Sequence, residues 1–215
     1  MKKSIFAILA LSILAFSFKS IITDGETYPT IKLGDEAPKT DLKMKEVNGN
    51  EYSLNDLKKE NGLLVIFSCN TCPFVIGNGE GSEGWQGRYN NLNDIATRAN
   101  IGMVLVNSNE AKRDGDDSFE KMKEHAAEQE YKSYYVMDSN SELANAFGAK
   151  TTPHVFLFDK NMKLVYKGSI DDNVKSAKDV KEDYLKTAIR QIVTGAEITK
   201  SETKAMGCSI KRVIK

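Results

Sequence analysis

The stretch that decides the fold is Gly62-Leu-Leu-Val-Ile-Phe67, followed after one serine by Cys69-Asn-Thr-Cys72-Pro73. A short apolar run with β-branched residues at its centre is typical of a strand buried on both faces. A Cys-x-x-Cys turn between such a strand and a helix indicates redox chemistry, because a helix N-terminus lowers the pKa of a nearby thiol. We expect Cys69 to be the nucleophile and Cys72 the resolving thiol, with Pro73 at an early helical position, where its missing N–H costs little.

Strand and helix patterns alternate on both sides of this segment. Before it, residues 42–46 predict a strand, Asn48-Gly49 predicts a type I′ hairpin turn, and Ser53 is expected to cap a short helix. After it, we expect strands over residues 103–106, 134–137, 155–158 and 164–166, and helices over 90–99, around 119–126, over 142–147 behind a Ser139-x-x-Glu142 capping box, and over 184–192. The pattern predicts an α/β fold with a central mixed sheet flanked by helices and an N-terminal hairpin.

The two ends of the chain differ from its middle. Lys2-Lys3 and the almost wholly apolar run from Ile5 to Phe16 predict a signal peptide over residues 1–20, cut after Ser17 or Ser20. We therefore expect export, to a periplasm if the source is Gram-negative; the alternative is an uncleaved N-terminal membrane anchor. A lead-in over residues 21–31, one domain over 32–195 and a C-terminal tail over 196–215 complete the predicted organisation.

Composition excludes several classes of function. The 215 residues include 30 basic and 30 acidic ones, and no dense run of Lys and Arg occurs, so nucleic acid is not an expected partner. The 3 cysteines are too few for a disulfide-stapled secreted scaffold, and the odd one, Cys208, needs its own explanation.

Two other interpretations of Cys69 and Cys72 stay open. The pair forms half of a zinc site if Cys208 and either His154 or His125 complete it, or it is an inert buried pair. A second closely spaced ligand pair is missing from the sequence, which disfavours zinc. Disulfide exchange needs no organic cofactor, and the sequence predicts neither a cofactor nor a resident metal.

Several motifs occur in an informative order. They are Gly34-Asp-Glu-Ala-Pro38, the Asn48-Gly49 hairpin with Tyr52-Ser53-Leu54, the Cys-x-x-Cys-Pro turn, and Phe147-Gly-Ala-Lys-Thr-Thr-Pro153. Together they resemble the redoxin branch of the thioredoxin superfamily, which groups with the alkyl hydroperoxide reductase/thiol-specific antioxidant proteins and their membrane-linked thiol reductases. The resemblance covers about residues 31–192. It implies a thioredoxin-like fold, thiol–disulfide oxidoreductase activity, and a partner that is a protein or small thiol, including a membrane-linked electron donor.

The resemblance also implies roles for single residues. Thr152-Pro153 would be the superfamily's cis-proline turn, with the Thr152 backbone pairing with an extended substrate peptide and Pro153 denying the thiols a competing donor; a trans proline at a strand start is the alternative. Peroxiredoxins carry Thr or Ser three residues before their reactive Cys, where Ile66 stands relative to Cys69, so a thiol peroxidase is the weaker enzymatic alternative. The buried acid that thioredoxins often hold before the motif is missing from residues 63–67.

Three further features carry open interpretations. The glycine-rich segment from Gly77 to Gly87 is either a mobile flap whose Trp85 contacts substrate or a flexible surface insertion. Cys208 relays electrons to the Cys69–Cys72 pair, bonds another chain, or is a small buried hydrophobe. His154 helps to stabilise a thiolate or is an ordinary histidine at the start of a strand.

Overall fold

The computed structural model describes residues 28–79 and 81–213. The predicted signal peptide and most of the predicted lead-in lie outside these residues. Within the described ranges, no helix is long and apolar enough to cross a membrane.

One mixed sheet organises the molecule. In the described part of the chain, seven strands follow the order β2-β1-β5-β4-β3-β7-β8, and β6 and β9 form a separate small sheet. The parallel pairs are β3 with β4 and β4 with β5; the other neighbours are antiparallel. The strands are β1 Met44–Glu46, β2 Glu51–Tyr52, β3 Leu63–Ser68, β4 Gly102–Asn107, β5 Tyr134–Met137, β6 Thr151–Thr152, β7 His154–Phe158, β8 Leu164–Gly168 and β9 Cys208–Ser209.

The apolar run quoted above becomes β3 because it is buried on both faces. Val65 sits between Val104 of β4 and Phe156 of β7. Alternate side chains point to opposite faces of a strand. Leu64 and Ile66 accordingly join one hydrophobic cluster, while Leu63, Val65 and Phe67 join the other.

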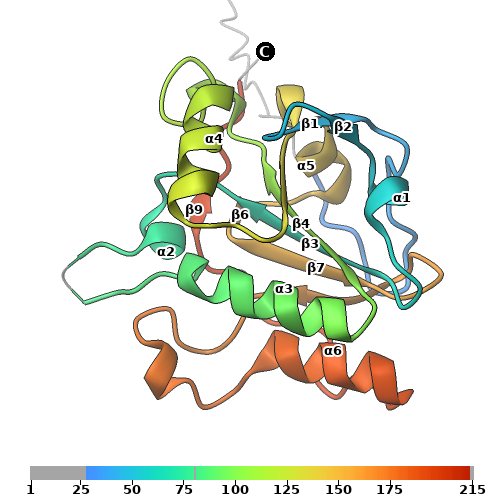
Figure 1. Ribbon diagram of the computed structural model, residues 1–215. Coiled ribbons are helices and arrows are strands. Elements are labelled where there is room, and N and C mark those ends of the chain that lie inside the picture. Colours follow the sequence, from blue (N-terminus) through green and yellow to red (C-terminus); the bar gives the residue numbers. More distant parts are fainter. Residues whose placement is uncertain (1–27, 80, 214–215) are drawn as a thin grey trace, which may run out of the picture.

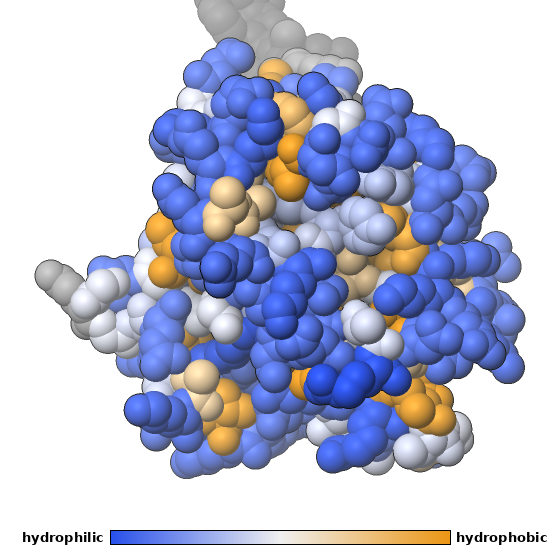
Figure 2. All heavy atoms as spheres, in the orientation of Figure 1, coloured by the Kyte–Doolittle hydropathy of each residue, from blue (hydrophilic) through white to orange (hydrophobic). Residues whose placement is uncertain are grey.

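Helices cover both faces of the sheet (Figure 1). The cluster with Leu64 and Ile66 receives Leu92 of α3 and Leu185 of α6, and the opposite cluster receives residues of α1 and α5. Polar side chains cover most of the face shown in Figure 2, with small apolar patches between them. The helices are α1 Leu54–Leu57, α2 Pro73–Ile76, α3 Tyr89–Arg98, α4 Phe119–Glu128, α5 Glu142–Phe147 and α6 Tyr184–Thr194, with 3-10 turns η1 Gln86–Arg88, η2 Glu110–Lys112, η3 Ser139–Ser141 and η4 Ala177–Asp179.

The predicted fold class is confirmed, with two local corrections. The hairpin is present, but its turn is not type I′: of Asn48 and Gly49 only Gly49 has a positive φ (94°), and its N–H donates to the Glu46 carbonyl (2.8 Å). This is a three-residue loop with glycine in the left-handed position. The predicted Ser139-x-x-Glu142 capping box is wrong, because the Asp138 carboxylate accepts the first N–H groups of α5 instead.

The short helix α1 forms as predicted. Ser53 Oγ accepts from the Asp56 N–H, and the Asp56 carboxylate accepts from the Ser53 N–H (2.7 Å), a reciprocal capping box.

Candidate functional site

Three free thiols gather where β3 ends. Cys69 follows β3 directly, Cys72 is the N-cap of α2, and Cys208 lies on β9. The strand β9 pairs antiparallel with β6, and this register sets Cys208 opposite Thr152. Figure 1 shows β9 beside β6, close to α2. The fold therefore brings the tail cysteine to the predicted redox pair.

Cys69 is enclosed. Its side chain is 1% exposed, its sulfur accepts the Cys72 N–H (3.3 Å), and it lies 3.2 Å from Thr152 Oγ1. Its hydrogen bond with Cys72, followed by burial, raises the pKa of the Cys69 thiol. Cys69 therefore holds its proton more firmly than a free cysteine.

Cys72 is the central sulfur of the three. As a thiol it donates to the Thr152 carbonyl oxygen (3.0 Å), and it accepts the Cys208 N–H (3.4 Å). Its hydrogen bond with Cys69 outweighs burial, and with help from the thiol and N–H of Cys208 it lowers the pKa of Cys72 to about 5. Burial and the same contact with Cys72 raise the pKa of Cys208 to about 11. The contacts among the three sulfurs therefore lower the pKa of Cys72 and raise those of Cys69 and Cys208.

The sequence-based expectation gave the lowered pKa to Cys69, whereas the contact between the two sulfurs lowers the pKa of Cys72. The first residue of α2 is Pro73, as predicted for that proline, and the backbone N–H of the N-cap residue Cys72 donates to Cys69 Sγ (3.3 Å).

Asn70, between the two cysteines, fastens the turn to the rest of the site. Its N–H donates to Asp117 Oδ1 (3.0 Å), its amide donates to the Asp116 carbonyl (2.8 Å), and its Oδ1 accepts from the Tyr135 hydroxyl (2.7 Å). Side-chain polar groups buried in this way are normally fully hydrogen-bonded. Three hydrogen bonds, to Asp117, Asp116 and Tyr135, therefore fix the conformation of the Cys-x-x-Cys turn.

Sequence reasoning missed Asp117. The Asp116-Asp117 pair reads as the acidic start of a helix, but Ser118 is the N-cap of α4, and Asp117 turns inward, fully buried. It also accepts from the amides of Asn107 and Asn109 (2.7 and 2.9 Å). The sequence did contain a signal for this. Ser118 is a good N-cap residue, and a helix that starts after Ser118 leaves Asp117 outside it.

Thr152 and Pro153 lie against the sulfurs. The Thr152–Pro153 peptide bond is cis, as the resemblance implied. Thr152 contacts Cys69 through its hydroxyl and Cys72 through its carbonyl. Its backbone, expected to be available to a substrate peptide, is paired with the protein's own tail through β9.

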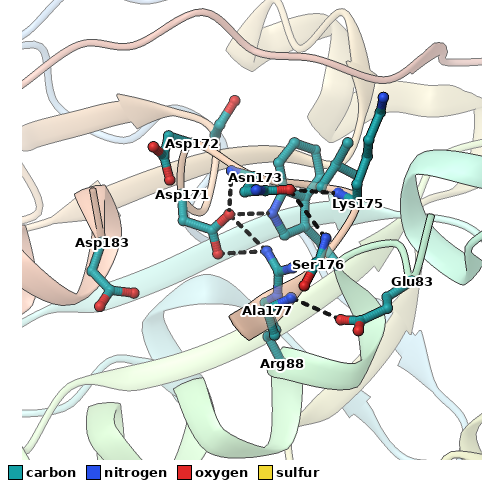
Figure 3. Close-up of polar contacts among 12 residues, drawn as sticks. Glu83, Arg88, Asp171, Asp172, Asn173, Lys175, Ser176, Ala177 and Asp183 are labelled. Carbon is teal, nitrogen blue, oxygen red and sulfur yellow. Dashed lines mark hydrogen bonds and ion pairs between the residues drawn. The ribbon is translucent and has the colours of Figure 1, made fainter. Parts of the chain in front are cut away.

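Trp85 lies in the core, a position that favours neither a flap whose Trp85 contacts substrate nor a flexible surface insertion. Its side chain is 0% exposed, and its indole N–H donates to Asp171 Oδ1 (2.9 Å). The Asp171 carboxylate also accepts from Arg88 Nη1 (2.6 Å), and Figure 3 shows these two side chains facing each other. Trp85 therefore packs in the hydrophobic core and bonds Asp171, which is a structural role.

The segment around Trp85 is fastened at several points. The Glu83 N–H donates to the Lys175 carbonyl (3.0 Å), and the Glu83 carboxylate accepts the Ala177 N–H (2.8 Å; Figure 3). Gly84 has φ +68°, and a Cβ there would lie 2.3 Å from the Val75 carbonyl. The glycine therefore permits a close approach to α2 as well as a turn.

Neither histidine completes a metal site with the thiols. Burial, then the charges of Lys167 and Lys150, lower the pKa of His154 to about 3, and its Nδ1 accepts the Lys150 N–H (3.2 Å). A neutral ring offers no positive charge to a thiolate. His125 bonds Gln86 instead. Among residues 28–79 and 81–213, no group of three or more His, Cys, Asp and Glu side chains could hold a metal ion.

Comparisons with known proteins agree with this architecture. A model of the redoxin family matches residues 32–183. No curated protein sequence matches the chain. The chain is similar to a solved hypothetical protein from Sinorhizobium meliloti 1021, with 27% identity and a TM-score of 0.75 over 86% of this chain and 97% of the other.

Two further solved structures extend the comparison. An uncharacterised conserved protein from Geobacillus kaustophilus has 30% identity and a TM-score of 0.75, covering 88% of this chain and 95% of its own. Peroxidoxin BcpB from Mycobacterium tuberculosis has 14% identity and a TM-score of 0.54, covering 76% and 91%. At that identity the likeness concerns the fold alone.

Proposed function

The chain belongs to the redoxin family of the thioredoxin superfamily and is a thiol-based redox protein. We propose that it is a thiol–disulfide oxidoreductase that works through Cys69 and Cys72. The observation that carries the proposal is the contact between the two sulfurs, which lowers the pKa of Cys72 to about 5 while it raises that of Cys69. One cysteine is then ready to attack, and the other retains the proton that a leaving thiolate needs.

The proposed reaction is two successive thiol–disulfide exchanges. The Cys72 thiolate attacks one sulfur of a substrate disulfide, forming a mixed disulfide and releasing the other substrate sulfur as a thiolate, which takes up a proton. Cys69 then gives up its proton and attacks Cys72 Sγ. This forms the Cys69–Cys72 disulfide and releases the second substrate thiol. The substrate gains two electrons and the pair loses two; run backwards, the same steps oxidise a dithiol.

The partners follow from this chemistry. A disulfide of a protein or of a small thiol would be the substrate, and a small thiol or a membrane-linked electron donor would return the pair to its reduced form. We further propose that the protein works after export, in a periplasm. The support is the sequence of residues 1–20, with an N-terminal membrane anchor as the alternative.

The test is a redox titration of the protein without residues 1–20, with alkylation and mass analysis at each cysteine. We expect a reversible two-electron couple shared by Cys69 and Cys72, between about −120 and −270 mV. A pair that forms no disulfide, or that stays oxidised below about −300 mV, would contradict the proposal.

Two added measurements separate the alternatives. Hydroperoxide consumption with sulfenic acid at a cysteine of the pair would indicate a thiol peroxidase. Stoichiometric zinc in the purified protein, lost when either cysteine is replaced, would indicate a metal-binding module. We expect neither result.

A further inference from the structure

Cys208 touches the redox pair from a different part of the chain. Its N–H donates to Cys72 Sγ (3.4 Å), and its thiol shares a hydrogen bond with the same sulfur. Cys72 therefore has two cysteine neighbours, Cys69 from its own turn and Cys208 from the tail. We propose that Cys208 is a third redox-active thiol, one that forms a disulfide with Cys72 in exchange with the Cys69–Cys72 disulfide. This inference rests on the proposed function.

The tail that carries Cys208 is fixed on both sides of it. Before it, Thr203 Oγ1 accepts the Ser169 N–H (2.9 Å) and the Thr203 N–H donates to the Lys167 carbonyl (3.0 Å). After it, the Ile210 N–H donates to the Lys150 carbonyl (3.1 Å), and the Ile210 side chain is buried in the core. These contacts on both sides fix the position of Cys208 relative to Cys72.

Gly207 allows the tail to come this close. A Cβ on Gly207 would lie 2.2 Å from the Thr152 carbonyl oxygen, a distance that real Cβ atoms essentially never show. The same carbonyl accepts from the Cys72 thiol. The absence of a side chain before Cys208 therefore lets the tail approach the backbone that Cys72 also contacts.

While the tail is in place, Cys72 is less accessible to an outside sulfur than Cys208 is, so the attack of Cys72 on a substrate requires the tail to move. The Cys69 and Cys72 side chains are 1% and 4% exposed, whereas Cys208 is half-buried. Cys208 is therefore the thiol that meets both the interior pair and solvent. A substrate disulfide or a reducing thiol in solution reaches Cys208 more easily than it reaches Cys69.

The exchange balances without an added oxidant. Starting from the Cys69–Cys72 disulfide, Cys208 loses its proton and attacks Cys72 Sγ. The Cys72–Cys208 bond forms, the Cys69–Cys72 bond breaks, and Cys69 leaves as a thiolate that takes up the proton. One disulfide and one thiol stand on each side of the equation.

The test traps the new disulfide in a Cys69→Ser variant of the protein without residues 1–20. Oxidised glutathione is added, and the cysteines are mapped by mass spectrometry after alkylation of free thiols. We expect a Cys72–Cys208 disulfide within one chain, with loss of both free thiols. A stable glutathione adduct on Cys72, with Cys208 still a free thiol, would overturn the proposal.

A matched control moves the thiol by one residue. Ser209 follows Cys208 on β9, is exposed, and pairs with Thr151, so its side chain points to the other side of the strand. The variant carrying Cys69→Ser, Cys208→Ser and Ser209→Cys keeps the thiol count. We expect it to give only the glutathione adduct. An equally abundant disulfide from position 209 would show that a mobile tail suffices and would overturn the inference.

The wild-type protein supplies a readout that needs no folded variant. During the redox titration, Cys208 should lose part of its free thiol while Cys69 regains the same fraction. A Cys208 that stays fully alkylatable at every potential would overturn the proposal even if Cys69 and Cys72 form their couple. A missing Cys69–Cys72 couple would instead count against the proposed function, so the two failures are distinguishable.

Discussion

Two segments that look like appendages in the sequence flank the redox turn, and they are fastened in different ways. The first segment, residues 77–87, is held through Trp85 and the adjoining Arg88, because the indole N–H and the guanidinium both bond the buried Asp171 carboxylate. The tail is held by the backbone pairing of Cys208 with Thr152, a residue that contacts both Cys69 and Cys72. Both depend on a glycine, Gly84 in one and Gly207 in the other. The first segment completes the core and the second completes the site.

The difference shows what decides whether such a segment takes part in chemistry. Trp85 is the more conspicuous residue in the sequence, yet every contact described for it is structural. Cys208 looks like a leftover cysteine, yet it is the one that meets Cys72. We therefore expect changes near Asp171 to alter stability and changes in the tail to alter thiol reactivity.

The largest expected effect comes from breaking the ion pair. Asp171→Asn keeps the size of the side chain but leaves Arg88, 8% exposed, without its paired charge. Breaking a buried pair in this way costs about 3–5 kcal/mol in the free energy of unfolding. Urea denaturation followed by Trp85 fluorescence measures it.

The neighbouring acid provides the control for this variant. Asp172 accepts the Lys181 N–H at the surface, so Asp172→Asn should change the free energy of unfolding far less. The Cys69–Cys72 couple should be the same in both proteins wherever they are folded. A loss below about 1 kcal/mol for Asp171→Asn would show that the pair behaves like a surface ion pair and would remove the contrast between the segments.

Gly207→Ala should release the tail while leaving all three thiols in place. The added Cβ would meet the Thr152 carbonyl at 2.2 Å. Overpacking costs about 1–3 kcal/mol. If lifting the tail relieves that strain, the lifted population, and with it the alkylation rate of Cys72, rises about 5- to 150-fold.

Gly87→Ala is the matched change in the other segment, because a Cβ there would meet nothing within 4 Å. Its alkylation rates should equal those of the wild type. Unchanged Cys72 reactivity in Gly207→Ala would mean that the tail does not limit access to the site.

We also expect the free energy of unfolding to fall in acid because of His154, which lies beside the tail. His154 shares a cavity with tail residues Thr203, Lys204 and Ala205. Its pKa is lowered from 6.5 to about 3, so between these values the unfolded chain binds the proton and the folded one does not. Stability is complete above pH 6.5 and falls as the pH drops towards 3, by up to about 1.4 kcal/mol per pH unit.

His154→Asn should remove this contribution while offering an acceptor to the Lys150 N–H. The readout is the free energy of unfolding at pH 7.5 and at pH 5.5, where the variant should lose about 1.4 kcal/mol less than the wild type. Equal losses in the two proteins would show that His154 is not the group responsible.

The sequence predicts what depends on local pattern and fails where distant segments meet. The run before Cys69 predicts β3 because both of its faces are apolar, and Gly148 and Gly195 mark helix ends by their left-handed conformation. Pro73 likewise predicts the start of α2, where the structure has it. Which cysteine has the lowered pKa also depends on Cys208 and Thr152, and no local pattern brings those residues to Cys72.

Long-range contacts account for the rest. Trp85 and Asp171 are 86 residues apart, and Cys208 and Cys72 are 136 apart. The strands β6 and β9 contain 2 residues each, too short for a period to be read. The sequence identified the odd cysteine, but the sheet edge it joins is visible only in the folded chain.

The most direct test of the account is the pKa of each cysteine in the reduced protein, from the pH dependence of iodoacetamide labelling with mass analysis of each site. We predict that the labelling rate of Cys72 follows a pKa of about 5, while Cys69 and Cys208 react only at high pH. Labelling of Cys69 with the low pKa, and of Cys72 only at high pH, would contradict the claim that Cys72 is the attacking sulfur.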